Sequence, residues 1–233
     1  MEMLLEFARG PVFRLSFTLM ILGLLRLIIL HLINAYEMFL RSNRRPVPIK
    51  QIIKATTGWL IPFNRSGLRT IFILVSFIFH ITVIITPFFL SAHILLWERG
   101  VGISYPAMSQ AMANCMTLIA IVTSLVLFLR RIFSKAAREL SSLQDFLIPL
   151  LVLIIFLTGF LAMHPRINPI NYNSTMLMHV MSGNIIFILI PFTKLSHVVL
   201  FWETQFISEM GWHFDTDSVE NVTLSLGKEE EPV

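Results

Sequence analysis

The hydrophobic stretch that decides the fold runs from Met176 to Trp202 and reads MLMHVMSGNIIFILIPFTKLSHVVLFW. It carries His179 and His197, which are 18 residues apart, and Lys194 is the only other ionisable residue between them. At about 100° and 1.5 Å per residue, one continuous helix would place both imidazoles on one face, roughly 27 Å apart. Because a hydrocarbon core is about 30 Å thick, we expect one imidazole near each membrane surface, which suits two metal centres at different depths.

The composition is that of an integral membrane protein. Of the 233 residues, 55% are hydrophobic and 14% are charged, whereas about a quarter of the residues in a soluble domain are charged. The predicted fold is an all-α integral membrane bundle of five transmembrane helices, because only helices satisfy the backbone of such apolar runs in lipid. We expect these spans: Val12–Phe39, Leu68–Trp97, Met112–Phe133, Leu143–Met163 and Met176–Trp202. They form one domain over residues 1–202, followed by an acidic tail over residues 203–233.

Basic residues predict the orientation, because cytoplasmic loops are enriched in Lys and Arg. Basic residues cluster after the first and third spans: Arg41, Arg44, Arg45, Lys50, Lys54, Arg65 and Arg69, then Arg130, Arg131, Lys135 and Arg138. The other two loops contain only Arg99 and Arg166. The N-terminus is therefore expected outside and the C-terminus in the cytoplasm, in a multi-pass protein of the cell's inner (cytoplasmic) membrane.

Two segments outside the spans leave alternatives open. The segment from Pro48 to Pro62 has apolar residues at near-helical spacing, so it is either a short interfacial helix or an ordinary loop. The acidic tail either docks a soluble subunit or is a solvated end.

Four histidines lie at compatible depths in two spans. His80 and His93 belong to the second span, which runs antiparallel to the fifth, so His93 is expected near His179 and His80 near the level of His197. Two histidine pairs that bridge two helices are what two bis-histidine b-type haems require. The alternative is that each histidine only hydrogen-bonds a neighbouring helix. The 13-residue spacing of His80 and His93 gives about 220° of rotation in an ideal helix, so both rings point the same way only if a kink or bulge at Pro87, which lies between them, resets the phase.

The segment from Met178 to His197 resembles the last helix of the gamma subunit of respiratory nitrate reductase, which has a histidine pair at this spacing and a Pro-Phe-Ser-Arg-Leu-Val-His ending. The likeness extends to the sequence RRIFS that begins at Arg130, to the five helices and to the outer N-terminus. It implies that His179 and His197 each ligate a different haem b. By the same likeness, His80 and His93 match the family's two histidines on the second helix.

The chain departs from that family in the second span, where the family spaces its histidines by ten residues. If Thr86-Pro87 is aligned with a Thr-Pro of the family instead, one deep ligand is missing and only one haem is implied. Two haems, with the pairs His93/His179 and His80/His197, are the preferred reading because both histidines then have partners.

The sequence TPFFLSAH, from Thr86 to His93, and the short tail look closer to a sister group. These are the cytochrome b subunits of sulfate-reducer transmembrane redox complexes. The likeness implies a cytoplasmic iron–sulfur partner, either heterodisulfide-reductase-like or nitrate-reductase-beta-like, and other membrane and periplasmic cytochrome subunits. Lipid surrounds such a protein, and no nucleic-acid partner is expected.

Two cations are candidates for binding haem propionates. Arg26 lies deep in the first span, where an unpaired charge costs about 2.5 kcal/mol or more. Its partner is either a propionate or a carboxylate or carbonyl of the protein. Lys194 lies one turn before His197, where it either binds a propionate or extends its ammonium group to the interface.

Four residues at the outer ends of the second and fourth spans are candidates for a quinone site: Glu98, Arg99, His164 and Arg166. Oxidation of a quinol such as menaquinol releases protons, so an acid–base group beside the outer haem makes chemical sense, and Glu98 or His164 fits that role. If the outer partner is a multihaem c-type cytochrome, no quinone site is needed.

Three classes of function remain at this point. The leading one is a di-haem b-type membrane cytochrome that relays electrons between a quinone pool or an outer redox partner and a cytoplasmic iron–sulfur subunit. The second is a transporter or proton channel that uses the four histidines as relay groups, and the third is a haem-free membrane anchor for soluble redox subunits.

Overall fold

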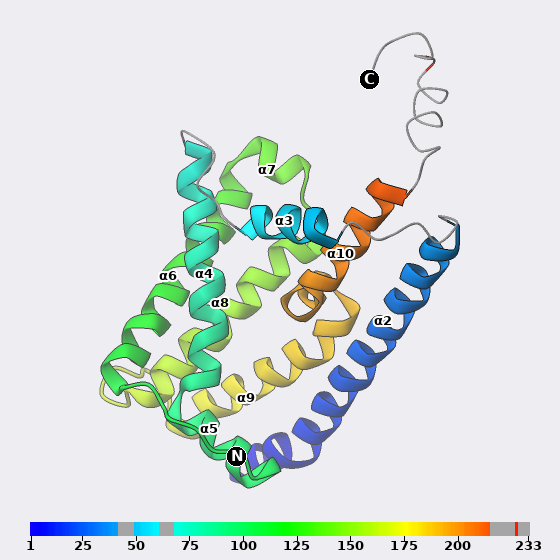
Figure 1. Ribbon diagram of the computed structural model, residues 1–233. Helices are drawn as coiled ribbons and strands as arrows, with labels where there is room; N and C mark the ends of the chain where they lie inside the picture. The colour runs from blue at the N-terminus through cyan, green and yellow to red at the C-terminus, as the bar shows by residue number, and fades with distance from the viewer. Residues whose placement is uncertain (42–48, 61–67, 215–226, 228–233) are drawn as a thin grey trace. The chain divides into compact units, whose positions relative to one another are not determined.

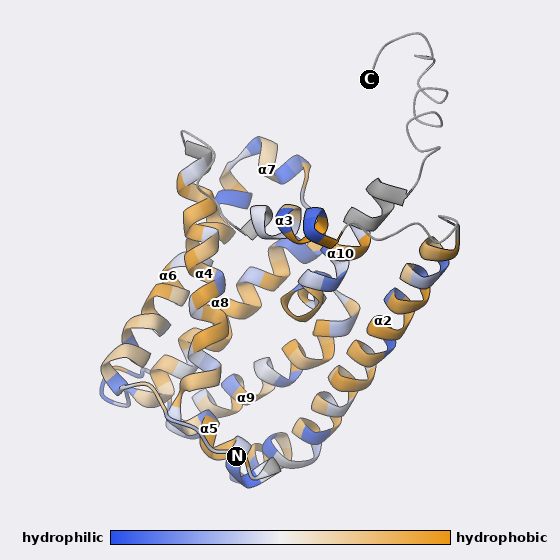
Figure 2. Ribbon diagram, viewed as in Figure 1, coloured by the Kyte–Doolittle hydropathy of each residue, from blue (hydrophilic) through white to orange (hydrophobic). Residues whose placement is uncertain are grey.

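The computed structural model describes residues 1–41, 49–60, 68–214 and 227, and no strand occurs among them. The described residues include five helices that are long and apolar enough to cross a membrane: Glu2–Leu40, Thr70–Phe89, Gln110–Phe133, Leu143–Met163 and Tyr172–Phe192. Figure 2 shows the apolar residues that run along them. The predicted all-α class and the number of helices able to span a membrane are therefore confirmed.

The chain forms two compact units, Met1–Leu19 with Pro62–Leu189 and Met20–Ile61 with Ile190–Val233. In the first unit, four helices pack side by side in chain order (Figure 1): α4 (Leu68–Phe89), α6 (Gln110–Phe133), α8 (Leu143–Met163) and α9 (Tyr172–Leu189). The second unit contains most of α2 (Phe13–Arg41) and the contact between α3 (Ile49–Leu60) and α10 (His197–Phe214).

Small residues allow the helices of the first unit to approach closely. Ala120 of α6 is fully buried and packs with Val152 and Phe156 of α8. Ser124 is also fully buried, and its hydroxyl donates to the carbonyl of Ala120 at 2.6 Å. Such residues suit a lipid environment, where close van der Waals packing replaces the hydrophobic effect between helices.

A buried polar contact ties the N-terminal segment to α9. The chain begins with α1 (Glu2–Phe7) and continues through the π-helical η1 (Ala8–Val12), which contains Pro11. Asn184 of α9 donates its side-chain amide to the carbonyl of Ala8 at 3.1 Å, and Ser16 donates its hydroxyl to the Asn184 side-chain oxygen at 2.9 Å. Because proline removes a backbone donor from the helix, side-chain donors are valuable beside this segment.

The second span is not one helix. α4 ends at Phe89, Leu90 is extended with φ −74° and ψ 127°, and α5 (Ser91–Val101) follows. The single helix predicted for Leu68–Trp97 is therefore wrong. The break at Leu90 lies between His80 and His93, three residues after Pro87, so an extended residue changes the phase of the helix where a kink or bulge at Pro87 was considered.

The last span is also interrupted. α9 is followed by two 3-10 segments, η3 (Ile190–Phe192) and η4 (Lys194–Ser196), before α10 begins at His197. Between them Thr193 is extended, and its hydroxyl oxygen accepts the amide of Leu195 at 3.3 Å. Pro191 cannot donate to the preceding turn, so the helix ends there. The prediction of one continuous helix through both histidines is therefore wrong.

In the second unit, α3 is a helix and not a loop. Its Ile52 is 1% exposed and packs against Met38, Phe39 and Phe206. Nearby, His31 lies 3.4 Å from the carboxylate of Glu203, measured from Nδ1 to Oε2. The boundary predicted between the membrane domain and the tail, after Trp202, falls inside α10.

Several expectations concern residues outside the described ranges. They are the acidic residues of the tail beyond Phe214 and the loop arginines Arg44, Arg45 and Arg65.

Candidate functional site

The two histidines expected at the outer membrane surface lie together. His93 is in α5 and His179 is in α9, and both belong to the first unit. Their ring centroids are 6.1 Å apart, and their ring planes differ by only 21°. Both side chains are half-buried. The structure thus pairs two imidazoles from segments that are far apart in the sequence.

Both rings are oriented by backbone carbonyls. Nδ1 of His93 lies 2.9 Å from the carbonyl oxygen of Pro87, and Nδ1 of His179 lies 2.9 Å from that of Ile155. A carbonyl only accepts hydrogen bonds, so each Nδ1 carries the proton and each Nε2 keeps its lone pair. Metal-binding histidines usually have this arrangement, in which the second nitrogen donates to a carbonyl or carboxylate.

The spacing of the rings fits a shared metal ion. Two imidazole nitrogens that bind one metal ion from opposite sides at about 2.0–2.1 Å each are about 4 Å apart, which puts the ring centroids roughly 6 Å apart. The observed centroid distance is 6.1 Å. In the part of the chain that the structure describes, no three His, Cys, Asp or Glu side chains gather. A two-histidine site suits a haem, whose porphyrin supplies the other four ligands, better than a structural zinc, which takes four protein ligands.

The helix break at Leu90 explains the His93 contact. In an unbroken helix the Pro87 carbonyl would accept the amide of Ser91, four residues later. Instead it accepts the imidazole of His93. His93 lies beyond the candidate span that ends at Phe89, and burial lowers its pKa from the usual imidazole value, while the bond to Pro87 acts in the opposite direction. The neutral imidazole that burial favours is the form that binds metals.

Gly159 of α8 makes room for the His179 ring. A Cβ atom at this position would lie 2.9 Å from Cε1 and 3.1 Å from Nδ1 of His179. Gly159 is one turn after Ile155, so the missing side chain lets the imidazole reach the Ile155 carbonyl. Our sequence analysis missed this residue. Its one signal was a glycine inside an apolar span, a position that often marks close approach of another group.

Arg9 is a second residue that our sequence analysis missed. It lies in η1, and its side chain is exposed. The Asn184 contact to Ala8, next to Arg9 in the sequence, ties this segment to α9.

His80 and His197 lie in different units. His80, in α4, places Nδ1 2.6 Å from the Ser76 carbonyl and packs edge-on against Phe79. His197 is the first residue of α10, its side chain is exposed, and its Nδ1 contacts the Lys194 carbonyl. Each therefore has the same Nδ1-to-carbonyl orientation as the outer pair.

The two candidate propionate cations both lie in the second unit. Arg26 is in α2 and Lys194 is in η4, and both side chains are exposed. The described residues include no carboxylate paired with Arg26.

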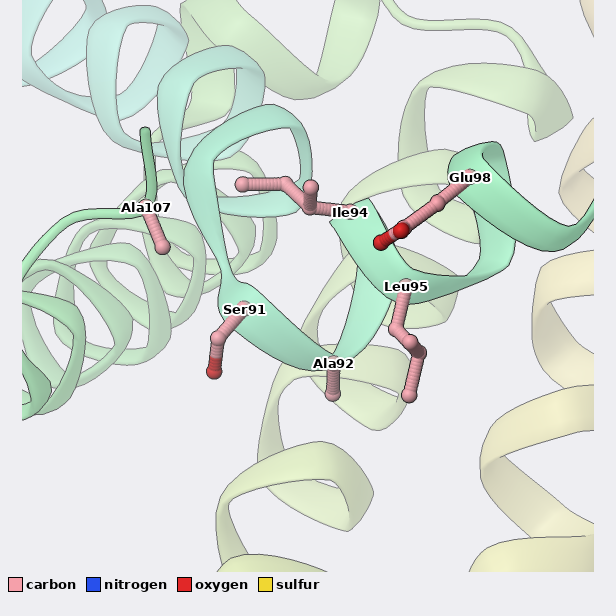
Figure 3. Close-up of a pocket in the computed structure, with 6 residues that line it drawn as sticks. All are labelled: Ser91, Ala92, Ile94, Leu95, Glu98 and Ala107. Atoms are coloured by element: carbon pink, nitrogen blue, oxygen red, sulfur yellow. The ribbon is translucent and has the colours of Figure 1, made fainter. Parts of the chain in front are cut away.

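Glu98 lines a surface pocket of about 350 Å³ on α5, the helix that carries His93. Figure 3 shows the lining side chains: Ser91, Ala92, Ile94, Leu95 and Glu98 from α5, and Ala107 from the loop before α6. Ser104 donates its hydroxyl to the Glu98 carboxylate at 3.5 Å. The pocket combines apolar walls with one carboxylate.

The other three quinone-site candidates do not line this pocket. Arg99 follows Glu98 in α5 and is exposed, and Arg166 is exposed in the loop after α8. His164 ends α8, where its Nδ1 lies 2.8 Å from the Phe160 carbonyl and its ring stacks on Phe160 at 4.1 Å. Within the described residues, no hydrogen bond or ion pair joins His164 to Glu98.

Comparison with known proteins finds one relative that shares most of its length with this chain. The two are 31% identical over 204 residues, which are 85% of this chain and 89% of the relative. The relative comes from Nitratidesulfovibrio vulgaris (strain Hildenborough), and its name reads only "Protein". No family model matches the chain, and no solved structure matches it.

Proposed function

We propose that this chain, which belongs to one family with the Nitratidesulfovibrio vulgaris protein, is a di-haem b-type membrane cytochrome subunit. It relays electrons across the membrane between a quinone or an outer redox partner and a cytoplasmic iron–sulfur subunit. The observation that carries the proposal is the His93–His179 pair, with its 6.1 Å spacing and both Nδ1 atoms on carbonyls. The resemblance to the nitrate reductase gamma subunit and to sulfate-reducer cytochrome b subunits supports it.

In this proposal His93 and His179 hold the outer haem, and His80 and His197 hold the inner one. A haem b, when bound, supplies a one-electron carrier. The Pro87 and Ile155 carbonyls hold the outer imidazoles in one tautomer and one orientation. The assignment of His80 and His197 as the inner pair is supported by the resemblance and by the contact of each Nδ1 atom with a backbone carbonyl.

Three cations are proposed to bind propionates. Arg9 serves the outer haem, because its segment, η1, is tied to the helix of His179 by the bond from Asn184 to the Ala8 carbonyl. Arg26 and Lys194, in the second unit, serve the inner one.

The proposed orientation puts the N-terminus outside and the C-terminus in the cytoplasm, in the inner membrane. The cluster of basic residues in the loops after the first and third spans supports it. The cytoplasmic face is then where an iron–sulfur partner docks, either heterodisulfide-reductase-like or nitrate-reductase-beta-like. A reporter protein that is active only in the cytoplasm, fused after Val233, tests this orientation. It is expected to be active.

The outer electron donor is proposed to be a quinol, such as menaquinol, bound in the Glu98 pocket. Oxidation of one quinol yields a quinone, two electrons and two protons. Glu98 accepts one proton, because its carboxylate is the acid–base group among the pocket's lining residues, while the other proton is released to water and the two electrons leave through the proposed relay. The apolar walls formed by Ile94 and Leu95 suit the ring and tail of a quinone.

Replacement of Glu98 by Gln is expected to slow haem reduction by a soluble quinol about 100-fold, the usual scale of general base catalysis. Stopped-flow absorbance at the α-band measures the rate. Glu139→Gln is the matched control, because Glu139 pairs with Lys135 outside the pocket. Equal rates in the E98Q variant and the wild type would remove Glu98 from the proton path. If quinol reduces neither protein, the outer donor is a cytochrome partner.

The deciding experiment is a reduced-minus-oxidised visible spectrum of the purified chain, with haem quantified per polypeptide. About two b-type haems per chain are expected. One haem would favour the alignment that leaves one of His80 and His93 without a haem. The absence of haem would contradict the cytochrome proposal. The remaining candidate functions would then be a histidine-based transporter and a haem-free anchor.

A further inference from the structure

A second surface groove lies at one end of the first unit, where α4 begins and α6 ends. Its volume is about 450 Å³, and its lining residues are Phe72, Val126, Leu129, Arg130, Phe133 and Ser134. Four of these six residues are apolar. Leu129 is 37% exposed and Phe133 is 78% exposed, so apolar surface of the groove faces outward.

The groove carries a positive charge that no carboxylate of the described residues neutralises. The Arg130 guanidinium lies 4.0 Å above the centroid of the Phe72 ring. Throughout the described ranges, no acidic side chain pairs with Arg130. The next residue, Arg131, differs, because it lies 3.6 Å from the carboxylate of Asp145 and also bonds that residue's carbonyl.

The groove lies where two candidate spans reach the membrane surface. One span begins at Thr70, two residues before Phe72, and another ends at Phe133. Arg130 and Ser134 are therefore at the level of lipid headgroups, while Val126 is about one to two turns deeper in the apolar region. Apolar walls with a cation at the boundary match the layout of a phospholipid.

We infer that this groove binds one anionic phospholipid. Arg130 pairs with the headgroup phosphate while its other face rests on Phe72. Ser134 accepts the Ala137 amide at 3.4 Å, so its hydroxyl hydrogen remains to donate to the phosphate. An acyl chain lies along Val126, Leu129 and Phe133. A free phosphate would not use those apolar walls. The site is independent of the haems and goes beyond the proposed electron relay.

The test uses the full chain purified in detergent and native mass spectrometry with dioleoyl phosphatidylglycerol or dioleoyl phosphatidylcholine. The wild type is expected to bind the anionic lipid more tightly. Arg130→Gln is expected to weaken phosphatidylglycerol binding about ten-fold, the scale of one charge-assisted hydrogen bond. Lys135→Gln is the matched control, since it removes the same charge from a residue that pairs with Glu139 and does not line the groove.

Equal binding of the two lipids by the wild type would overturn the proposal, as would unchanged binding by R130Q or an equal loss in K135Q. Phe133→Ala tests the wall without disturbing the core, because Phe133 is largely exposed. It is expected to weaken both lipids alike. If the spectra instead show a dimer that F133A dissociates, a second copy fills the groove and the lipid site is wrong. Circular dichroism confirms that each variant is folded.

Discussion

Replacement of His179 by Gln is expected to lower the haem content from about two to about one per chain, because a carboxamide does not replace an imidazole as an axial ligand. Gln retains an N–H that can donate to the Ile155 carbonyl, which His179 now bonds at 2.9 Å. The helix packing should therefore survive while the metal ligand is lost. Quantified haem and the amplitude of the α-band measure the result.

His93→Gln is expected to remove the same haem, since the two imidazoles lie 6.1 Å apart as one pair. The double variant should then also retain about one haem, because residues that act as a unit are not additive. Two separate sites would instead lose two haems. His164→Gln is the control, because His164 is another half-buried histidine of the first unit with Nδ1 on a carbonyl. It should keep both haems, and full haem content in the H179Q variant would contradict the ligand assignment.

Gly159→Ala is expected to weaken outer-haem binding about 10–100-fold, the usual cost of disturbing a group that orients a metal ligand. The new methyl group would lie 2.9 Å from His179 Cε1, so the ring must shift away from the Ile155 carbonyl. Any outer haem that remains should have a higher midpoint potential, because an imidazole that loses this hydrogen bond donates less electron density. A redox titration of the α-band and the haem content measure both effects.

Gly183→Ala provides the matched control within α9. A Cβ atom there would lie 3.5 Å from Cδ1 of Ile155, which is ordinary van der Waals contact. Haem content and potential should therefore equal those of the wild type. If haem content and midpoint potential are unchanged in G159A but altered in G183A, Gly159 does not position His179. Thermal unfolding separates loss of haem from loss of fold, since overpacking alone costs about 1–3 kcal/mol.

The spans could be predicted because lipid imposes a simple condition on sequence. A run of about 20 apolar residues must be helical, whatever its neighbours are. The fourth span, Leu143–Met163, has the predicted bounds, and the third begins only two residues before the predicted Met112. The second and fifth spans are interrupted at Leu90 and Thr193, and hydropathy does not report backbone angles. Pro87 and Pro191 were the local signals of those interruptions.

Hydropathy along the chain was enough to predict an all-helical membrane protein with five spans, and the depths of His93 and His179 in antiparallel spans were enough to predict that they are neighbours. How those imidazoles are oriented could be learned only from the packing of the helices. The Pro87 carbonyl is available because Leu90 is extended, and the Ile155 carbonyl is reachable because Gly159 lacks a side chain. Both hydrogen bonds depend on how closely particular segments approach one another in the folded protein. Composition and residue spacing do not determine how close that approach is.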